Sequence, residues 1–320
     1  MRTSKRSKAA LRVGLLTLSA IFLFEGCGKK APIETVAPPA TEASSVPSTT
    51  EARKQKENLE TILVLGLDKN EYPDDSRAYI NDMQGDFNLL LVLDHSTNTC
   101  SPLLLNRDTM TEITRLGVFG DEAGTFTGQL ALAHTYGSGG SDSCLNAKKA
   151  VSKLLGGVSI DHYMSFTMDS VPTVNDSVGG VTVTVLDDFK DNPDLRKGEE
   201  VTLHGEEALL YVRGRQNAGD QTNLSRMKRQ EQYMTALMAK LMDAARGDAD
   251  FLTKLTFRLG DSFQTDYSVS QLQTLADTLL ETKIEPFLTI DGEAQKGEEF
   301  MEYYVDATSL EKTIQTLFYE

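Results

Sequence analysis

Short apolar runs predict buried β-strands in the first half of the chain. The segment TILVLGLD is apolar over Ile62–Leu67 and ends at Asp68, and FNLLLVLD repeats this pattern over Phe87–Asp94. SPLLLNRD, residues 101–108, is a third segment of this kind. Runs of this length without polar alternation are typical of strands that are buried on both faces of a sheet.

Two later segments also have strand character. HYMSFTM, residues 162–168, is mainly apolar and aromatic, and VTVTVLDD, residues 181–188, alternates valine with threonine. The second segment follows the pair Gly179–Gly180, which is typical of a turn. We therefore predict strands in both segments.

Helical spacing of apolar residues separates these strands. One predicted helix opens with Ser and Asp at 141–143 and stops at Gly156, and a long one ends at Gly247. The predicted helices cover residues 141–157, 204–213, 223–247, 268–281 and 306–319. Buried strands that alternate with helices predict an α/β fold with a three-layer αβα architecture.

The N-terminal 27 residues resemble an export segment. A basic stretch, MRTSKRSKAALR, precedes the uncharged run Val13–Phe24, and Gly26 stands directly before Cys27. This run is shorter than the about 20 residues of an ordinary membrane span, so it predicts a signal peptide with a lipobox and lipidation at Cys27. An uncleaved signal anchor is the alternative. Both place the rest of the chain on the extracytoplasmic face of the cell membrane.

The next segment, residues 28–58, is rich in Pro, Ala, Ser, Thr and Glu and has no apolar period. It is predicted to be a disordered linker. No second linker or internal repeat follows. We therefore predict one folded domain over residues 59–320.

The chain is strongly acidic, with 32 Lys+Arg against 47 Asp+Glu and a formal net charge of −15. This charge argues against general binding of nucleic acid, which requires a basic surface. Beyond Cys27, only Cys100 and Cys144 remain, and isolated buried thiols are favoured over a disulfide. No Cys/His spacing indicates a zinc site.

Against this acidic background, cations gather in YVRGRQNAGDQTNLSRMKRQ, Tyr211–Gln230, which holds five basic residues and one acid. Arg213 and Arg215 point the same way if the segment is extended. Arg226 and Arg229 share one face near the start of the long helix, and Lys228 points away from it.

A helix N-terminus attracts anions, and arginine grips phosphate oxygens in pairs. The cluster, joined by Arg107, therefore predicts a site for a highly charged anion. The alternative is a solvated helix face, in which the helical arginines pair with Glu231.

Two carboxylates complete the predicted site. Asp68 ends one buried run and Asp86 begins the next, so neighbouring strands bring both to one edge of the sheet. Such a pair beside phosphate-binding arginines suits Mg²⁺. The alternative is that each is a turn or cap residue. Asp108 is a candidate cap for a helix in TMTEI, residues 109–113.

Several of these segments together resemble the LytR-CpsA-Psr (LCP) family. They are ILVLGLDKN, GDFNLLLVLD, LLLNRDTMTEI, SVGGVTVTV, GEEALLYVRGR and SRMKRQEQYMTALMAKL, in that order over roughly residues 60–245. The resemblance implies a mixed central sheet flanked by helices. It also implies an enzyme that uses Mg²⁺ and attaches a glycan from a polyprenyl-(pyro)phosphate carrier to peptidoglycan, with an apolar groove for the lipid.

By position, the resemblance marks Asp68 and Asp86 as the acids linked to Mg²⁺ and as catalytic residues. It marks six residues as contacts of the diphosphate: Arg107, Arg213, Arg215, Arg226, Arg229 and Gln230. Of these, Arg107, Arg213 and Arg215 are also expected to be catalytic.

This chain departs from the family pattern at three positions. Gln84 stands where most members have Arg, and Arg77 is a candidate substitute for that cation. Asn106 replaces a usual Pro, and Asn223 stands where many members have Asp.

We therefore expect an extracytoplasmic glycopolymer phosphotransferase. A peptidoglycan hydroxyl would attack the sugar-linked phosphorus and polyprenyl phosphate would leave, with Asp68 or Asp86 as a candidate acceptor for the hydroxyl proton. One alternative is a hydrolase that passes the phosphorus of the polyprenyl pyrophosphate to water. Another is a non-catalytic lipoprotein that binds the carrier lipid or the glycan, with Gln84 as a sign of lost activity.

Overall fold

The computed structural model describes residues 54–73 and 79–320, which belong to one compact unit. The predicted signal segment with Cys27, most of the predicted linker and Arg77 lie outside these residues. The interpretations that concern them therefore remain predictions.

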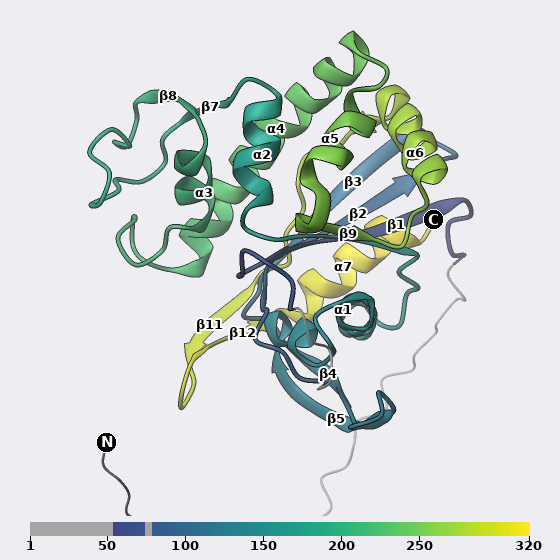
Figure 1. The fold of residues 1–320 in the computed structure, drawn as a ribbon. Coiled ribbons are helices and arrows are strands. Elements are labelled where there is room, and N and C mark those ends of the chain that lie inside the picture. Colours follow the sequence, from purple (N-terminus) through teal and green to yellow (C-terminus); the bar gives the residue numbers. More distant parts are fainter. Residues whose placement is uncertain (1–53, 74–78) are drawn as a thin grey trace, which may run out of the picture. The chain divides into compact units, whose positions relative to one another are not determined.

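A six-stranded mixed sheet forms the centre of the fold (Figure 1). Its strands are β1 Leu59–Leu67, β2 Gly85–Asp94, β3 Thr99–Leu105, β6 His162–Phe166, β9 Phe263–Thr265 and β10 Lys283–Ile284. They lie in the order β10-β3-β2-β1-β6-β9. β1 pairs with β2 in antiparallel and with β6 in parallel orientation, which makes the sheet mixed.

Helices cover both faces of this sheet, as predicted (Figure 1). On one face lie α1 Ser141–Leu154 and α7 Ala307–Phe318, and on the other lie α4 Asn223–Gly247, α5 Phe251–Leu259 and α6 Val269–Glu281. In β1, Leu63 and Leu65 pack into a first hydrophobic core, on the face covered by α1 and α7. Ile62 points to the opposite face and packs into a second core, against α4 and α6. Because both faces are buried, the strands read as continuous apolar runs.

A third core lies beside the second layer of helices. It joins the hairpin of β7 Val181–Thr184 and β8 Glu200–Leu203 to α2 Ser170–Ser177, α3 Glu206–Arg213 and α4. Val181 and Val183 point into this core, as the valine–threonine alternation predicts. The core fixes the end of α3 against α4, and both helix ends contribute to the site described below.

The predicted helix in TMTEI is wrong. This segment belongs to an antiparallel hairpin of β4 Met110–Leu116 and β5 Glu122–Gln129, which is followed by a 3₁₀ turn at Leu130–Thr135. The β-branched residues Thr111 and Ile113 are buried, whereas Glu112 between them is exposed. This alternation with period two fits a half-buried strand better than a helix turn.

Another hairpin, β11 Gly292–Lys296 and β12 Met301–Val305, follows the strands of the sheet in sequence and contacts the residues just before β4. The backbone N–H of Tyr303 donates to the carbonyl of Asp108 over 2.8 Å. This hairpin was not predicted, because β11 is mostly exposed and has no run of apolar residues.

The boundary of the folded part differs slightly from the predicted one. Gln55 forms a β-bridge with Tyr319, and the N–H of Lys56 donates to the carbonyl of Phe318 over 2.9 Å. Residues 54–56, which the composition assigned to the linker, therefore pack against the end of the chain. In the described ranges 54–73 and 79–320, every helix is too short or too polar to cross a membrane.

Candidate functional site

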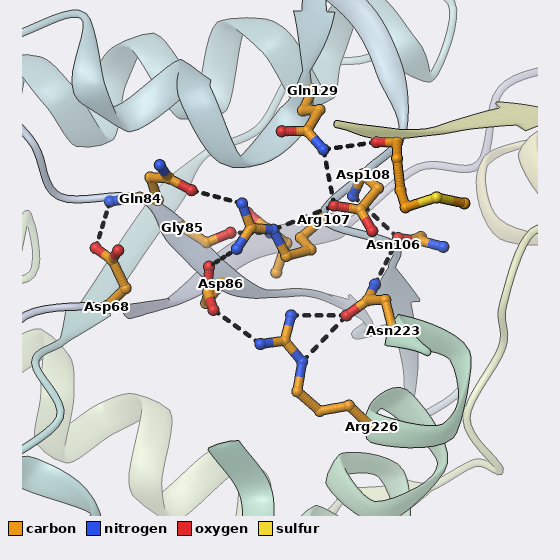
Figure 2. Close-up of polar contacts among 12 residues, drawn as sticks. Asp68, Gln84, Gly85, Asp86, Asn106, Arg107, Asp108, Gln129, Asn223 and Arg226 are labelled. Atoms are coloured by element: carbon orange, nitrogen blue, oxygen red, sulfur yellow. Dashed lines mark hydrogen bonds and ion pairs between the residues drawn. The ribbon is translucent and has the colours of Figure 1, made fainter. Parts of the chain in front are cut away.

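Two arginines and one aspartate form the centre of the candidate site (Figure 2). Asp86 is the second residue of β2, Arg107 follows the end of β3, and Arg226 lies in the first turn of α4. Asp86 Oδ1 accepts a hydrogen bond from Arg107, and its Oδ2 accepts one from Arg226 Nη1 over 2.8 Å. The side chains of Arg107 and Arg226 are only 13% and 4% exposed, so these charges meet in a largely water-excluded place.

The other predicted acid, Asp68, lies directly after β1 and beside this cluster. Its Oδ1 accepts the backbone N–H of Gln84 over 2.7 Å, and the Gln84 side-chain oxygen accepts from Arg107 Nη2 over 2.5 Å (Figure 2). Burial raises the pKa of the Asp68 carboxyl, and the negative charge of Asp86 adds to this rise. The two predicted acids therefore interact electrostatically at one edge of the sheet.

Two asparagines extend the cluster on the other side of Arg226. Asn223 Oδ1 accepts from Arg226 Nε over 3.1 Å and from Arg226 Nη2 over 2.6 Å. Asn223 Nδ2 donates to Asn106 Oδ1 over 2.7 Å. Two of the positions that depart from the family pattern are thus hydrogen-bonded to each other.

Asp108, next to Arg107, is held by residues from outside the central sheet. Its Oδ1 accepts from Gln129 Nε2 over 2.9 Å and lies 3.4 Å from Arg107 Nε. Gln129 also donates to the carbonyl of Met301 over 2.7 Å, which ties the hairpin of β11 and β12 to the site (Figure 2). Burial raises the pKa of Asp108.

Arg213 and Arg215 lie at the mouth of the site. The prediction that the two share an extended segment is wrong, because Arg213 is the last residue of α3. Both nevertheless line one pocket together with Asp86, Arg107 and Arg226. The volume of this pocket, which we call the cationic pocket, is about 750 Å³. Neither side chain forms an ion pair or hydrogen bond within the described part of the chain, so both charges are available to a ligand.

Arg229 has a different environment from the other predicted contacts. Its side chain is 0% exposed and forms an ion pair with Asp187. Its guanidinium also donates to the carbonyls of Tyr211 and Gly214, at the end of α3. Arg229 shares the buried helix face with Arg226 as predicted, but it does not line the cationic pocket and instead holds the segment that carries Arg213 and Arg215.

A small pocket of about 90 Å³ shares Asp86, Arg213 and Arg226 with the lining of the cationic pocket. Asp68, Asp86, Arg213 and Gln230 all line it, so it brings together both predicted acids and the predicted glutamine. Gln230 is oriented by its side-chain donor bond to the carbonyl of Val212 over 3.2 Å.

A separate apolar pocket of about 320 Å³ lies between α5, α6 and the strands β6 and β9. Phe166 lines both this pocket and the small one. The remaining lining is almost entirely apolar and includes Leu255, Leu259 and Leu275. The sequence did not predict these residues individually, because in a helical pattern they are indistinguishable from ordinary core positions.

The donor set of the small pocket fits Mg²⁺. Asp68 Oδ2 accepts no hydrogen bond from any described residue, and Asp86 faces the same pocket. Residues 54–73 and 79–320 contain no group of three or more Asp, Glu, His or Cys side chains that could hold a metal ion. Two carboxylates suit an ion that completes its coordination with water and substrate phosphates.

Sequence reasoning did not find every residue that builds the site. It did not single out Asp187, which anchors Arg229 and accepts from Ser225 Oγ over 2.6 Å, or Gln129, which holds Asp108. The acidic pair Asp187–Asp188, which follows an alternating strand, could have marked Asp187 as a candidate site residue. No pattern in the sequence marks Gln129.

A profile of the LytR_cpsA_psr family matches residues 30–318 of this chain. Among curated proteins, the chain is 27% identical over 241 residues to the polyisoprenyl-teichoic acid–peptidoglycan teichoic acid transferase TagV of Bacillus subtilis (strain 168), covering 72% of this chain and 58% of TagV. It is 28% identical over 181 residues to TagU of the same organism, covering 56% of this chain and 51% of TagU. The chain thus spans about half the length of these relatives.

Solved structures show the same fold. The crystal structure of B. subtilis TagV has a TM-score of 0.61 at 26% identity and covers 82% of this chain and 96% of that chain. A structure titled TagT bound to LIIa-WTA has a TM-score of 0.61 at 21% identity, covering 82% of this chain and 90% of that chain. The protein gbs0355 of Streptococcus agalactiae has a TM-score of 0.65 at 21% identity, covering 81% and 86%.

Proposed function

The chain belongs to the LytR_cpsA_psr family, and from this premise we propose that it transfers a glycopolymer from a polyprenyl-pyrophosphate carrier to peptidoglycan. The observation that carries this proposal is the sequence of pockets: an apolar one, a small one with two carboxylates, and a cationic one. A polyprenyl diphosphate has the same order of properties along its length. The relatives named as teichoic acid transferases support the same substrate class.

The apolar pocket is the proposed place of the polyprenyl chain next to its diphosphate. Phe166, at the junction with the small pocket, would contact the first isoprene units. Removing one methylene group from water contributes about 0.8 kcal/mol, so even a short piece of tail adds appreciably to affinity.

The diphosphate is proposed to lie between Arg226, Arg107 and the exposed pair Arg213 and Arg215. Arg226 and Arg107 share Asp86 and are held in place, whereas the exposed pair has no protein partner among the described residues. The site thus combines donors that protein partners hold in place with donors that have no protein partner. Preorganised donors of this kind stabilise the charge that develops on a transferring phosphoryl group.

Asp68 and Asp86 are the residues that would hold Mg²⁺, and a bound ion would supply further positive charge to the diphosphate. In the reaction, a peptidoglycan hydroxyl forms a bond to the sugar-linked phosphorus. The bond from that phosphorus to the bridging oxygen breaks, and polyprenyl phosphate leaves. The hydroxyl proton passes to Asp68 or Asp86, or to the leaving phosphate.

We further propose that the catalytic part works on the extracytoplasmic face of the membrane, held there by the N-terminal segment. The basic stretch, the apolar run and Cys27 carry this proposal. Replacing Cys27 with alanine is expected to abolish labelling with a radioactive fatty acid. A full-length protein that stays in the membrane without lipid would favour the signal anchor.

The proposed function is tested by product analysis with a synthetic glycan-linked polyprenyl diphosphate. We expect polyprenyl monophosphate and a glycan–acceptor product in the presence of Mg²⁺ and peptidoglycan fragments, and no turnover after chelation. Equal release of polyprenyl phosphate with and without the acceptor would identify a hydrolase. Binding without turnover would identify a carrier-binding protein.

Filling the apolar pocket should remove the contribution of the lipid. Thr256 lies on α5 and lines this pocket, so Thr256→Trp is expected to weaken binding of a ten-carbon polyprenyl diphosphate about tenfold or more, the equivalent of about 1.4 kcal/mol. Inorganic pyrophosphate should bind as before. Phe119→Trp, at an 88% exposed position on the hairpin of β4 and β5, is the matched control. Calorimetric titration of the wild type and both variants with each probe measures these affinities. An equal loss for both probes would place the lipid elsewhere.

The exposed arginines are expected to act through two-pronged contacts. Arg213→Lys should weaken diphosphate binding almost as much as Arg213→Ala, by roughly ten- to a hundredfold, because a lysine cannot reproduce the planar fork. Lys228→Ala should have little effect, since Lys228 is exposed on α4 and lines none of the three pockets. Equal, small losses at both positions would mean that the cluster is only a solvated surface.

A further inference from the structure

Side-chain amides take part in orienting the two central arginines of the site. Gln84 Oε1 accepts from Arg107 Nη2, and Asn223 Oδ1 accepts from both Nε and Nη2 of Arg226. Among the residues that the structure describes, Asp86 is the one carboxylate that hydrogen-bonds to both guanidinium groups (Figure 2). Each arginine is therefore held by a neutral amide on one side and by the shared Asp86 on the other, and Arg107 Nε also lies 3.4 Å from Asp108 Oδ1.

The orientation of the amide at position 223 is determined by its neighbours. The backbone N–H of Asp108 donates to Asn106 Oδ1 over 3.0 Å, so this oxygen, and not the amide nitrogen of Asn106, faces inward. Asn223 must then present a donor to Asn106 and an acceptor to Arg226, and its amide supplies both. A carboxylate at position 223 could satisfy Arg226 but would set two acceptor oxygens against each other at Asn106.

Neutral amides have a second consequence. A carboxylate in either place would also orient the arginine, but it would cancel a positive charge in a part of the site that is largely shielded from water. Arg226 lines both the cationic and the small pocket, and Arg107 lines the cationic pocket. Amide partners leave more of this positive potential to the ligand.

We propose that Gln84 and Asn223 are positioning residues that align Arg107 and Arg226 for a diphosphate without neutralising them, and that Asn106 fixes the orientation of Asn223. This inference rests on the proposed function for the identity of the anion. The three residues that depart from the family pattern thus share one role, which is to orient Arg107 and Arg226. Gln84 is then a working component of the site rather than a sign of lost activity.

The test compares amide-to-acid variants of the full-length protein. Gln84→Glu and Asn223→Asp are titrated with inorganic pyrophosphate and with a ten-carbon polyprenyl diphosphate in buffer with Mg²⁺. We expect both variants to bind either probe at least tenfold more weakly. The melting temperature of Gln84→Glu should be unchanged or higher, because its side chain still accepts from Arg107. Gln295→Glu, at an exposed position on β11, adds the same charge away from the pockets and should bind like the wild type.

A double variant separates positioning from charge. In the wild type, Asn106→Ala removes an acceptor from two donors, whereas in Asn223→Asp it also removes an oxygen–oxygen repulsion. The combined loss of affinity in Asn106→Ala/Asn223→Asp is therefore expected to be smaller than the product of the two single losses.

The outcomes are distinct. If the wild type binds neither probe, the proposed function fails. If the wild type binds and the acidic variants bind equally well, or if the single losses at 106 and 223 simply multiply, the positioning role of the amides is wrong. A lower melting temperature with unchanged binding would likewise leave them a structural role only.

Discussion

Replacing Arg226 with alanine is expected to lower the turnover number about 10²- to 10³-fold. Arg226 is the most buried of the pocket-lining arginines, and three hydrogen bonds to Asn223 and Asp86 fix its guanidinium. Its remaining N–H groups are thus preorganised toward the pockets that it lines. Removing one preorganised donor from the charge of a transition state has an effect of this size.

Steady-state kinetics with the glycan-linked carrier measure this effect. Arg226→Lys should remain strongly impaired, because an ammonium group cannot bond to Asn223 and Asp86 in the same planar arrangement. Lys228→Ala, two residues further on the exposed face of α4, is the control for the helix. Turnover of Arg226→Ala within threefold of the wild type would remove Arg226 from the catalytic centre.

Replacing Arg229 with methionine is expected to destabilise the fold by about 3–5 kcal/mol, because it breaks a buried ion pair and leaves the other partners unpaired. The Arg229 side chain is 0% exposed and bonds to Asp187 and to the carbonyls of Tyr211 and Gly214. For a unit of this size the melting temperature should fall by roughly 10 °C. Thermal unfolding followed by circular dichroism measures the shift.

Lys228→Met is the matched control for Arg229→Met and should change stability by less than about 0.5 kcal/mol, since its side chain is exposed. The two substitutions make the same chemical change at adjacent positions. An unchanged melting temperature for Arg229→Met, combined with a large loss of diphosphate binding, would contradict the structural role of Arg229. It would restore this residue as a direct contact of the ligand.

The central sheet and its flanking helices were predictable because their signals are local. Strands such as β1 and β2 are buried on both faces and read as apolar runs, and α4 shows helical spacing over its whole length. The hairpin of β4 and β5 was missed at Met110–Leu116, where a short segment with threonines fitted a capped helix as well as a strand. Pairing with the next strand, β5, which lies outside this segment, decided the outcome.

The candidate site was predictable in its residue types but not in its pairing. The density of arginines in an acidic chain indicated the cationic pocket, and Asp68 and Asp86 reached one edge of the sheet because two neighbouring strands end and begin there. The ion pair between Arg229 and Asp187 could not be predicted, because the two residues are 42 positions apart in the chain and no local pattern links them. The bond between Asn106 and Asn223 joins positions 117 apart in the chain and left no local signal.

The most direct measurement follows the sugar-linked phosphorus of the carrier. A glycan-linked polyprenyl diphosphate with radioactive phosphorus at that position is incubated with the protein, Mg²⁺ and peptidoglycan fragments. We expect the label to move to the peptidoglycan as a phosphodiester while unlabelled polyprenyl phosphate is released, with transfer by Arg226→Ala slower by about 10²- to 10³-fold. Label that appears instead on free glycan phosphate, or that stays on the lipid, would contradict a phosphotransferase.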